Sequence, residues 1–319
     1  MATGSVAARL GRSARSSRAA LAFGVLALTW LAAVLFADGF GSTASVRYLV
    51  QTAAFLGIVA VGQTLVIMGS GIDLSVSGVV ALSAVVCAQV SATSGGAAGI
   101  AVALAVCVLV GLVNAAGVTW LQVPPMVMTL ATGTILAGSL LVYTNGQPRS
   151  ARIPLLDSLA NDRFLGVPRA ALLWLVITAG CFWLLHLSRV GRYVFALGTS
   201  EPASRASGVP VPVTTLVVYG ACALLAGVAG LVLLGFTGTS SLTMGNPYQL
   251  LSIASVVLGG TSILGGRGHV LGTVAGALLL TLLTALLAAW DLAEGLRQVL
   301  LGALIIVLLL AYARERRTG

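Results

Sequence analysis

The chain has 319 residues, of which 58% are hydrophobic and only 8% are charged. Soluble domains usually carry about 25% charged residues, so no water-soluble core could hide this much apolar surface. The net charge is +9, but the arginines stand at predicted helix ends and in short loops, which favours membrane topology over nucleic-acid binding. The composition therefore predicts an all-α, polytopic membrane protein.

Ten apolar runs follow one another along the chain, most of them long enough to cross a hydrocarbon layer about 30 Å thick. They predict helices at 20–37, 48–69, 76–93, 97–119, 125–144, 170–188, 213–236, 249–264, 270–289 and 297–313. Gly, Ser and Thr interrupt the third and the eighth run. Either could be a broken or re-entrant helix, which a bilayer tolerates only where other protein or a water-filled cavity satisfies the backbone.

The predicted membrane domain covers residues 20–313 and includes a cytoplasmic connection at 189–212. A basic cytoplasmic tail is expected at 1–19 and a short cytoplasmic tail at 314–319. The basic start resembles a signal peptide, but the apolar run after it is long and many spans follow, which favours an uncleaved first helix.

The arginines predict how the chain is oriented. With ten spans and the N-terminus inside, eleven arginines fall on the inner side and six on the outer side, as expected when basic residues stay in the cytoplasm. Both termini are therefore expected inside. Five spans in each half would permit an inverted five-plus-five repeat, although no sequence identity between the halves supports it.

Small residues recur at four-residue spacing in several runs. Gly95 and Gly99, Gly272 and Gly276, and more loosely Ala226 and Gly230 follow this pattern. Such spacing lets helix backbones approach closely, so helix packing is the expected role of these residues.

The segment 62–78, GQTLVIMGSGIDLSVSG, contains the first candidate functional residues. It ends one span in Gly-Ser-Gly and places Asp73 and Ser75 where the next helix should begin. An Asp at this position usually caps the helix. The alternative is a polar element at the inner mouth of a pathway, because an acid near the membrane is costly unless it has a use.

The inner connection contains a helix-like stretch from Glu201 to Ser207, which Gly208 would end. A small amphipathic helix outside the membrane suits docking into a groove on a partner. The alternative is a surface loop that only connects two helices.

The segment 256–273 contains paired glycines around Arg267. It resembles a phosphate-binding loop, but no strand precedes it and the chain has no lysine to reach the phosphates. A tight inner turn is expected instead. No metal site is expected either, because the four cysteines lack C-x-x-C spacing and the two histidines have no ligand partner at metal spacing.

Four sequence patterns, from about residue 50 to the end, together resemble the permease subunits of bacterial ABC importers for monosaccharides. This is the ribose/xylose type within the wider branched-chain-amino-acid permease family. The patterns are Gly62-Gln63-Thr64 with 71–76 (GIDLSV), Val123-Pro124-Pro125 with Thr129-Leu130, Gly191-Arg192-Tyr193, and 257–262 (VLGGTS) with 265–268 (GGRG).

The resemblance implies a multi-pass protein of the bacterial cytoplasmic (inner) membrane. Two permease copies, surrounded by lipid, would pair with two ATP-binding subunits and receive sugar from an extracellular binding protein. The chain would then be no enzyme and hold no cofactor, because ATP and Mg²⁺ would bind to the partner subunit. Nucleic acid is not expected as a partner.

The resemblance also implies residue roles. Coupling to the ATPase is expected at Arg192, Tyr193, Glu201, Ala203, Ser204, Ala206 and Gly208. Here the chain departs from the usual pattern, since Ser200 stands where Asn is common and Ser204 where Ala is common, and Pro202 is unusual. The inner turns are assigned Asp73, Ser75 and Arg267.

Sugar hydroxyls need hydrogen-bond partners once they leave water. The candidate pathway residues are Gln63, Thr64, Asn114, Thr129, Thr132 and Thr261, although each could equally tie helices together. An ATPase-independent secondary transporter or channel is the alternative function, but no acidic residue lies clearly in the middle of a predicted span. A membrane-embedded enzyme has less support, because no paired nucleophile and base or His/Asp cluster is present.

Overall fold

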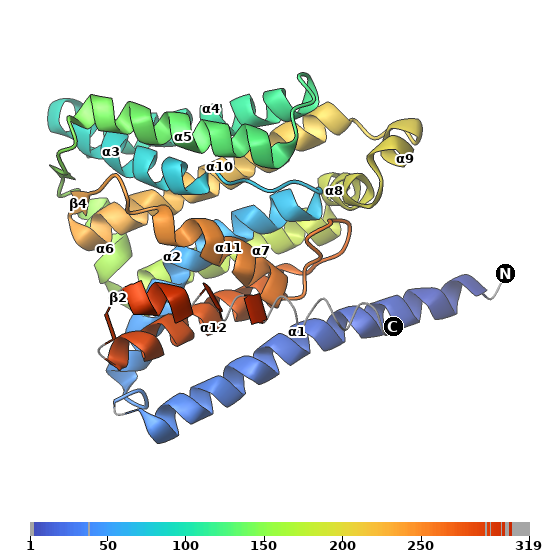
Figure 1. The fold of residues 1–319 in the computed structure, drawn as a ribbon, viewed down its shortest axis with the longest axis horizontal. Coiled ribbons are helices and arrows are strands. Elements are labelled where there is room, and N and C mark those ends of the chain that lie inside the picture. The colour runs from blue at the N-terminus through green and yellow to red at the C-terminus, as the bar shows by residue number, and fades with distance from the viewer. Residues whose placement is uncertain are drawn as a thin grey trace.

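A computed structural model describes residues 3–37, 39–290, 292–293, 295–300, 302–303 and 306–307, with side chains from residue 20 onward. This part of the chain is almost entirely helical (Figure 1). The helices are α1 (Thr3–Phe36), α2 (Thr43–Met68), α3 (Val76–Ser94), α4 (Gly96–Thr119), α5 (Pro125–Thr144), α6 (Pro154–Asn161), α7 (Arg169–Leu187), α8 (Arg189–Thr199), α9 (Glu201–Ala206), α10 (Val211–Thr237), α11 (Asn246–Leu258) and α12 (Val270–Ala289). The strands have two residues each: β1 (Arg149–Ser150), β2 (Arg163–Phe164), β3 (Val167–Pro168) and β4 (Thr239–Ser240).

Seven described helices are long and apolar enough to cross a membrane: α2, α3, α4, α5, α7, α10 and α12. Each coincides, within a few residues, with one of the ten predicted spans. The first predicted span, 20–37, forms the second part of the longer helix α1, whose apolar stretch is Ala20–Phe36. The tenth, 297–313, and the predicted tail at 314–319 lie largely or wholly outside the described residues.

The eighth predicted span, 249–264, is wrong in length. The helix found there, α11, has 13 residues and is therefore about 20 Å long, well short of the roughly 30 Å of a hydrocarbon layer. It ends at Gly259, and Gly260 follows with a φ of +87°, a conformation that favours glycine. Residues 259–269 form the predicted glycine-rich turn before α12.

The two longest described spans, α2 and α10, pack side by side in the centre of the bundle and run in opposite directions (Figure 1). Helices α3 and α4 pack on α10, whereas α7, α11 and α12 pack on α2. Helix α5 covers α3 and α4 and leaves its outer face open. The largest cluster of buried side chains accordingly lies between α2, α3 and α10.

Glycines allow the close helix contacts that their spacing predicts. A β-carbon on Gly230 of α10 would overlap the carbonyl oxygen of Val80 on α3. Gly272 and Gly276 of α12 lie equally close to the backbone of the α11 region. Gly95 does not pack in this way, because it has a φ of +84° and links α3 to α4 with no atom within 4 Å of its β position.

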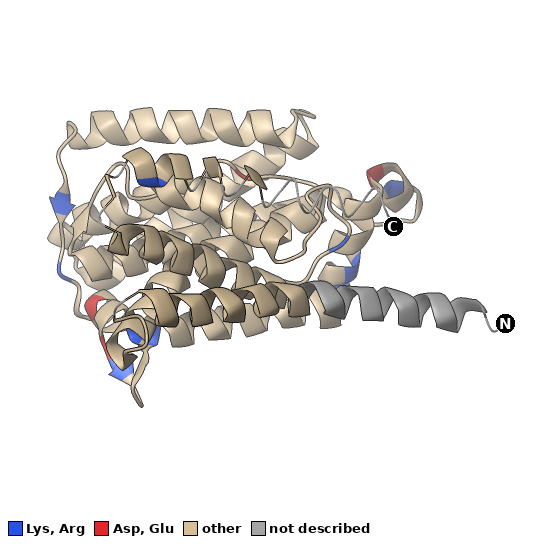
Figure 2. Ribbon diagram, turned by 60° about the horizontal axis from the view of Figure 1, so that its bottom comes forward, with Lys and Arg blue, Asp and Glu red and all other residues tan. Residues whose placement is uncertain are grey.

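The bundle has two ends that differ in structure. The α9 end carries α8, α9 and the turn 259–269, whereas the α6 end carries α6 and the four short strands (Figure 1). Strand β1 pairs with β4, and β2 pairs with β3, both antiparallel. Residues 145–169, between the fifth and sixth predicted spans, contain a helix and three strands, and arginines occur at both ends of the bundle (Figure 2).

Two non-helical links enter the bundle from opposite ends. The link 69–75 runs from the α9 end toward the middle before α3 begins, and the link 238–245 does the same from the α6 end before α11 begins (Figure 1). The starts of α3 and α11 meet there. The Oγ of Ser77 donates to Oε1 of Gln249 at 3.2 Å, and a β-carbon on Gly245 would overlap the carbonyl oxygen of Ser77.

The contact between α3 and α10 generates a prediction. The substitution Gly230→Ala should destabilise the folded protein by about 1–3 kcal/mol, because the added methyl group has no space beside the backbone of α3. Thermal unfolding in detergent measures the effect. Gly138→Ala on α5 is the matched control, since nothing lies within 4 Å of its β position, and it should be neutral or slightly stabilising. Equal melting temperatures for the two variants would contradict the packing argument.

Candidate functional site

A buried polar network begins in the link 69–75. The Oδ1 atom of Asp73 accepts hydrogen bonds from the backbone N–H of Ser75 at 2.9 Å and from its hydroxyl at 2.6 Å. Both residues are fully buried. Helix α3 begins one residue after Ser75, and Asp73 turns the chain ahead of that helix. Asp73 is therefore not the simple helix cap that the sequence favours.

The network continues from Ser75 to two neighbouring helices. The side-chain amide of Asn114, on α4, donates to Oγ of Ser75 at 2.9 Å. The hydroxyl of Thr132, on α5, donates to the carbonyl oxygen of the same Asn114 side chain at 2.6 Å. All of these side chains are buried, where hydrogen bonds are strong and an unpaired polar group is costly. The network thus ties the link to α4 and α5.

Thr129 of α5 satisfies the backbone of the same link. Its hydroxyl accepts from the N–H of Leu74 at 3.0 Å and lies 3.1 Å from the carbonyl oxygen of Ile72. The structure therefore brings together three of the six predicted pathway residues, Asn114, Thr129 and Thr132. In this conformation they contact other parts of the chain rather than an open channel.

The other three predicted pathway residues lie apart from this network. Thr64 of α2 pairs with the hydroxyl of Thr273 on α12 at 2.8 Å. Oε1 of Gln63 accepts from the thiol of Cys222 on α10 at 3.8 Å. Thr261 is buried in the turn 259–269. Thr64 and Gln63 thus join separate helices, whereas the hydroxyl of Thr261 accepts from the N–H of His269 at 3.4 Å within the same turn.

The sequence did not predict helix α8. Residues 189–199, which belong to the expected cytoplasmic connection, form an 11-residue helix capped by Ser188, whose hydroxyl accepts from the N–H of Gly191 at 3.2 Å. Val194 and Leu197 are buried on one face of this helix. Their three-residue spacing is the sequence signal that would have indicated it.

Helix α9 forms nearly where it was predicted. It runs from Glu201 to Ala206, and Gly208 follows with a φ of +76°. The hydroxyl of Ser200 accepts from the N–H of Ala203 at 3.4 Å, so Ser200 caps the helix. Pro202 stands in the first turn, where a missing N–H has little cost. Ser200 and Pro202, two of the three departures from the usual pattern, are thus compatible with a helix.

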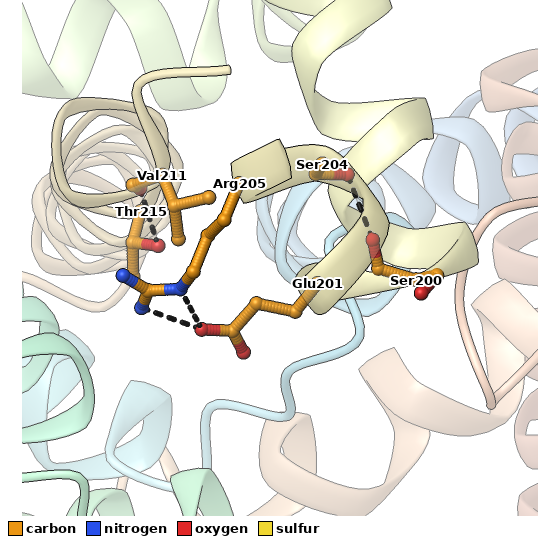
Figure 3. Close-up of polar contacts among 6 residues, drawn as sticks. All are labelled: Ser200, Glu201, Ser204, Arg205, Val211 and Thr215. Carbon is orange, nitrogen blue, oxygen red and sulfur yellow. Dashed lines mark hydrogen bonds and ion pairs between the residues drawn. The ribbon is translucent and has the colours of Figure 1, made fainter. Parts of the chain in front are cut away.

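Four of the seven predicted coupling residues lie on α9. Ala203 and Ala206 are exposed, and Glu201 and Arg205 form an exposed ion pair at 2.6 Å (Figure 3). Ser204 differs, because it is only 3% exposed and its hydroxyl donates to the carbonyl oxygen of Ser200 at 2.8 Å. Its side chain therefore lies on the inner side of α9 and not on the exposed face that is expected to dock.

Arg192 and Tyr193 lie on α8, the first exposed and the second half-buried. Arg267 is exposed on the turn 259–269, and its carbonyl oxygen accepts from the N–H of Ser262 at 2.8 Å. The three residues predicted for the inner turns therefore lie in two different places. Asp73 and Ser75 belong to the buried network, whereas Arg267 lies on the surface.

A three-way junction joins the α9 end to the link. The Oγ atom of Ser70 lies 2.9 Å from the carbonyl oxygen of Gly198 and 3.0 Å from that of Leu264. The N–H of Gly266 donates to the carbonyl oxygen of Met68 at 3.0 Å. The end of α8, the end of α2 and the turn 259–269 thus meet at one point, which sequence reasoning did not find.

Backbone conformation supports a specific role for Ser70 in this junction. Its φ is +64°, a left-handed value that is uncommon outside glycine. Glycine would adopt this conformation more easily but could not supply the hydroxyl. Gly198, in turn, leaves no space for a β-carbon, which would overlap the carbonyl oxygen of Met68.

Seven membrane-length helices with two non-helical links held inside the bundle define a polytopic membrane protein rather than a soluble binding module. Within the described residues, no group of His, Cys, Asp and Glu side chains is arranged to hold a metal ion. Residues 45–309 match the family described as the permease component of the branched-chain amino acid transport system, and the chain belongs to this family.

Curated relatives extend the comparison. The chain is 38% identical over 241 residues to the ribose import permease protein of Escherichia coli strain K12, covering 73% of this chain and 74% of the relative. It is 33% identical over 277 residues to the ribose import permease protein of Haemophilus influenzae, covering 85% and 86%. It is 32% identical over 303 residues to the fructose import permease protein of Rhizobium meliloti, covering 92% and 84%. The resemblance drawn from the sequence motifs is confirmed.

The buried network generates a prediction for a double-mutant cycle. Asn114→Ala and Thr132→Ala should each lower the free energy of unfolding by about 1–3 kcal/mol, because each leaves a buried partner unsatisfied. The double variant should lose less than the sum, with a coupling of about 0.5–3 kcal/mol. Denaturant unfolding in detergent measures all three. Thr134→Ala, an exposed threonine on α5, should be nearly neutral both alone and with Asn114→Ala. Strict additivity of Asn114→Ala and Thr132→Ala would contradict the network.

Proposed function

We propose that the chain is the membrane subunit of an ATP-driven importer and that its solute is a monosaccharide. The names of the relatives, which are ribose and fructose import permeases, support the class of solute. The observation that carries the mechanism is the junction at Ser70, because it connects the surface helices α8 and α9 with a link that reaches the buried network.

ATP and Mg²⁺ bind to a separate ATPase subunit in this proposal. The chain has no lysine and so cannot form a P-loop of its own. Helix α9 docks on that subunit through its exposed face, which includes Ala203 and Ala206. Closure of the ATPase pair then displaces α8 and α9, and the Ser70 junction moves the link, which is bonded to α4 and α5.

The orientation and repeat also belong to this proposal. The α9 end faces the cytoplasm and both termini lie inside. The chain crosses the membrane ten times, and the eighth crossing is made by the link 238–245 together with the short helix α11. The two links enter from opposite ends, and the helices that follow them, α3 and α11, meet where Ser77 bonds to Gln249. This arrangement supports an inverted five-plus-five repeat. A second permease copy completes the pathway, and an extracellular binding protein delivers the sugar at the α6 end.

One observation favours the alternative, a carrier that works without an ATPase. Asp73 is a fully buried acid, and its Oδ2 atom has no hydrogen-bond partner among the described residues. Ion-coupled carriers place ionisable groups in such positions. Measuring how sugar uptake depends on an ion gradient distinguishes the two functions. Uptake by the carrier would lose this dependence when Asp73 is replaced by Asn, whereas uptake by the ATP-driven importer would show no such change.

The proposed orientation predicts a labelling pattern. In a variant whose native cysteines, all buried, are replaced by alanine, Thr199→Cys should react only with a reagent added from the cytoplasmic side. Leu155→Cys, exposed at the α6 end, should react only from outside. Labelling of intact cells and of inverted vesicles with a membrane-impermeant maleimide distinguishes the two sides. The reverse pattern would overturn the orientation.

The docking surface predicts a loss of transport without loss of folding. Ala203→Trp and Ala206→Trp should leave the permease in the membrane but abolish sugar uptake and weaken retention of the ATPase, because a bulky side chain would separate the two subunits. Uptake into cells and co-purification of the ATPase measure the two effects. Ala97→Trp, exposed near the start of α4 at the opposite end, is the control and should retain the ATPase.

A loop that only connects helices would tolerate either replacement within about 0.5 kcal/mol. Normal uptake and normal ATPase retention in both α9 variants would therefore refute the docking role.

A further inference from the structure

The side chains predicted to line the pathway are turned into the bundle. All six of them are buried, and each bonds to another residue of the chain: Gln63, Thr64, Asn114, Thr129, Thr132 and Thr261. A solute that crosses the membrane still needs partners for its hydroxyl groups once they leave water. Those partners must be exposed polar side chains deep in the bundle.

The start of α11 presents such side chains. Helix α11 has 13 residues, so it is about 20 Å long, and it joins the turn 259–269 at the α9 end. Helix α2, on which it packs, has 26 residues and is about 39 Å long. The first turn of α11 therefore lies near the middle of the bundle (Figure 1). Asn246 is exposed there, and Gln249 is half-buried.

The carboxamide groups of these two residues have unused hydrogen-bonding capacity. The residues are three positions apart and so lie on the same side of α11. The amide of Asn246 has no hydrogen-bond partner among the described residues. Oε1 of Gln249 accepts from Ser77 at 3.2 Å, which leaves its Nε2 group as a donor without a partner in the same part of the chain.

These amides differ from the exposed hydroxyls of the bundle. The hydroxyl of Thr134, on the outer face of α5, donates to the carbonyl oxygen of Leu130 in its own helix at 3.0 Å and so tolerates lipid. An exposed carboxamide without such a bond would be costly against hydrocarbon, and polar groups at this depth mark the path of a solute. The face of α11 that carries Asn246 therefore contacts water and solute rather than lipid.

The chemistry of this face suits a neutral, hydroxylated solute. Helices α3, α11 and α12 and the link 238–245 carry no charged side chain, so an ion finds no opposite charge on them. A carboxamide supplies one acceptor oxygen and two donor hydrogens, and a hydroxyl can both donate and accept. Leu250, which is 66% exposed, follows Asn246 by one turn. Amides beside an apolar side chain suit a monosaccharide, in which hydroxyls and C–H groups alternate.

We propose that Asn246 and Gln249 bind the hydroxyl groups of the solute as it passes the middle of the membrane. This inference rests on the proposed function, which makes a monosaccharide the transported solute. Ser77, which bonds to Gln249, stands at the start of α3 directly after the link 69–75. A displacement of that link therefore also moves the partner of Gln249, so the solute contacts differ between the two transport states.

Cysteine labelling tests whether the face contacts water. In a variant whose four native cysteines are replaced by alanine, Asn246→Cys should react with a membrane-impermeant methanethiosulfonate reagent. The complex with the ATPase is labelled from each side, both without nucleotide and with ATP and vanadate. Val176→Cys is the matched control, because it is 68% exposed near the middle of α7 among apolar residues and should not react. Failure of Asn246→Cys to react in every condition would overturn the proposal.

Transport measurements test the contact with the solute. Proteoliposomes hold the permease with its ATPase and binding protein, and uptake of D-ribose and D-fructose is measured at saturating binding protein. Asn246→Leu and Gln249→Leu should each lower the maximal uptake rate about tenfold, the factor that corresponds to about 1.4 kcal/mol for one hydrogen bond. ATP hydrolysis without sugar should not change. Leu250→Met, on the same face, is the control and should retain normal uptake.

The remaining outcomes separate this site from other roles. Melting temperatures show whether the variants fold, and Asn246→Cys labelling tests the site even where a leucine variant does not. Normal uptake in both folded leucine variants would overturn the proposal. Failure of two differently tagged permease copies to co-purify in Asn246→Leu would also overturn it, because the amide would then join the two copies. Absence of ATP-driven monosaccharide uptake by the wild-type complex would instead refute the proposed function, on which the labelling result does not depend.

Discussion

Backbone that leaves the helical conformation inside a membrane bundle must find its hydrogen-bond partners in neighbouring protein, and the link 69–75 meets this requirement with side chains. Thr129 bonds to the backbone N–H of Leu74, and Asp73 bonds to that of Ser75. Because Thr129 belongs to α5 and the hydroxyl of Ser75 accepts from Asn114 of α4, the positions of α3, α4 and α5 depend on one short segment. The same polar side chains that the sequence offers as pathway candidates are thus needed to build the fold.

The link also connects the surface with the interior. At its outer end Ser70 contacts the end of α8 and the turn before α12, and at its inner end Ser75 contacts the network of α4 and α5. Segments from both halves of the chain meet at the outer end, whereas the partners at the inner end all come from the first half. In the proposed importer, hydrogen bonds and packed backbone therefore connect α9 continuously with the helices around the pathway. A displacement of α9 can reach those helices without a separate signalling element.

The sequence predicted those parts of the fold that depend on local composition. Hydropathy and length located seven spans, and the signals at Glu201 and Gly208 located α9. Hydropathy extended α11 too far, because apolar residues continue past Gly259 while the backbone turns there. Helix α8 lies in what the sequence indicated as a cytoplasmic connection, and the three-residue spacing of Val194 and Leu197 is too short a pattern to predict a helix without the packing that buries them. The pairing of Asn114 with Thr132 could not be predicted, since it depends on how α4 and α5 are placed relative to each other.

Gly198 determines how closely α8 packs against the end of α2 and the turn 259–269. Because no β-carbon fits between it and Met68, helix α8 cannot rotate about its axis or slide along α2 without separating from both Ser70 and Gly266. Helix α8, the end of α2 and the turn 259–269 therefore behave as one stiff body. Ser200, with an extended backbone (φ −164°, ψ 111°), is the single residue between this body and α9, so one residue sets the angle between α8 and α9, whereas residues 207–210 give the other end of α9 a longer connection to α10.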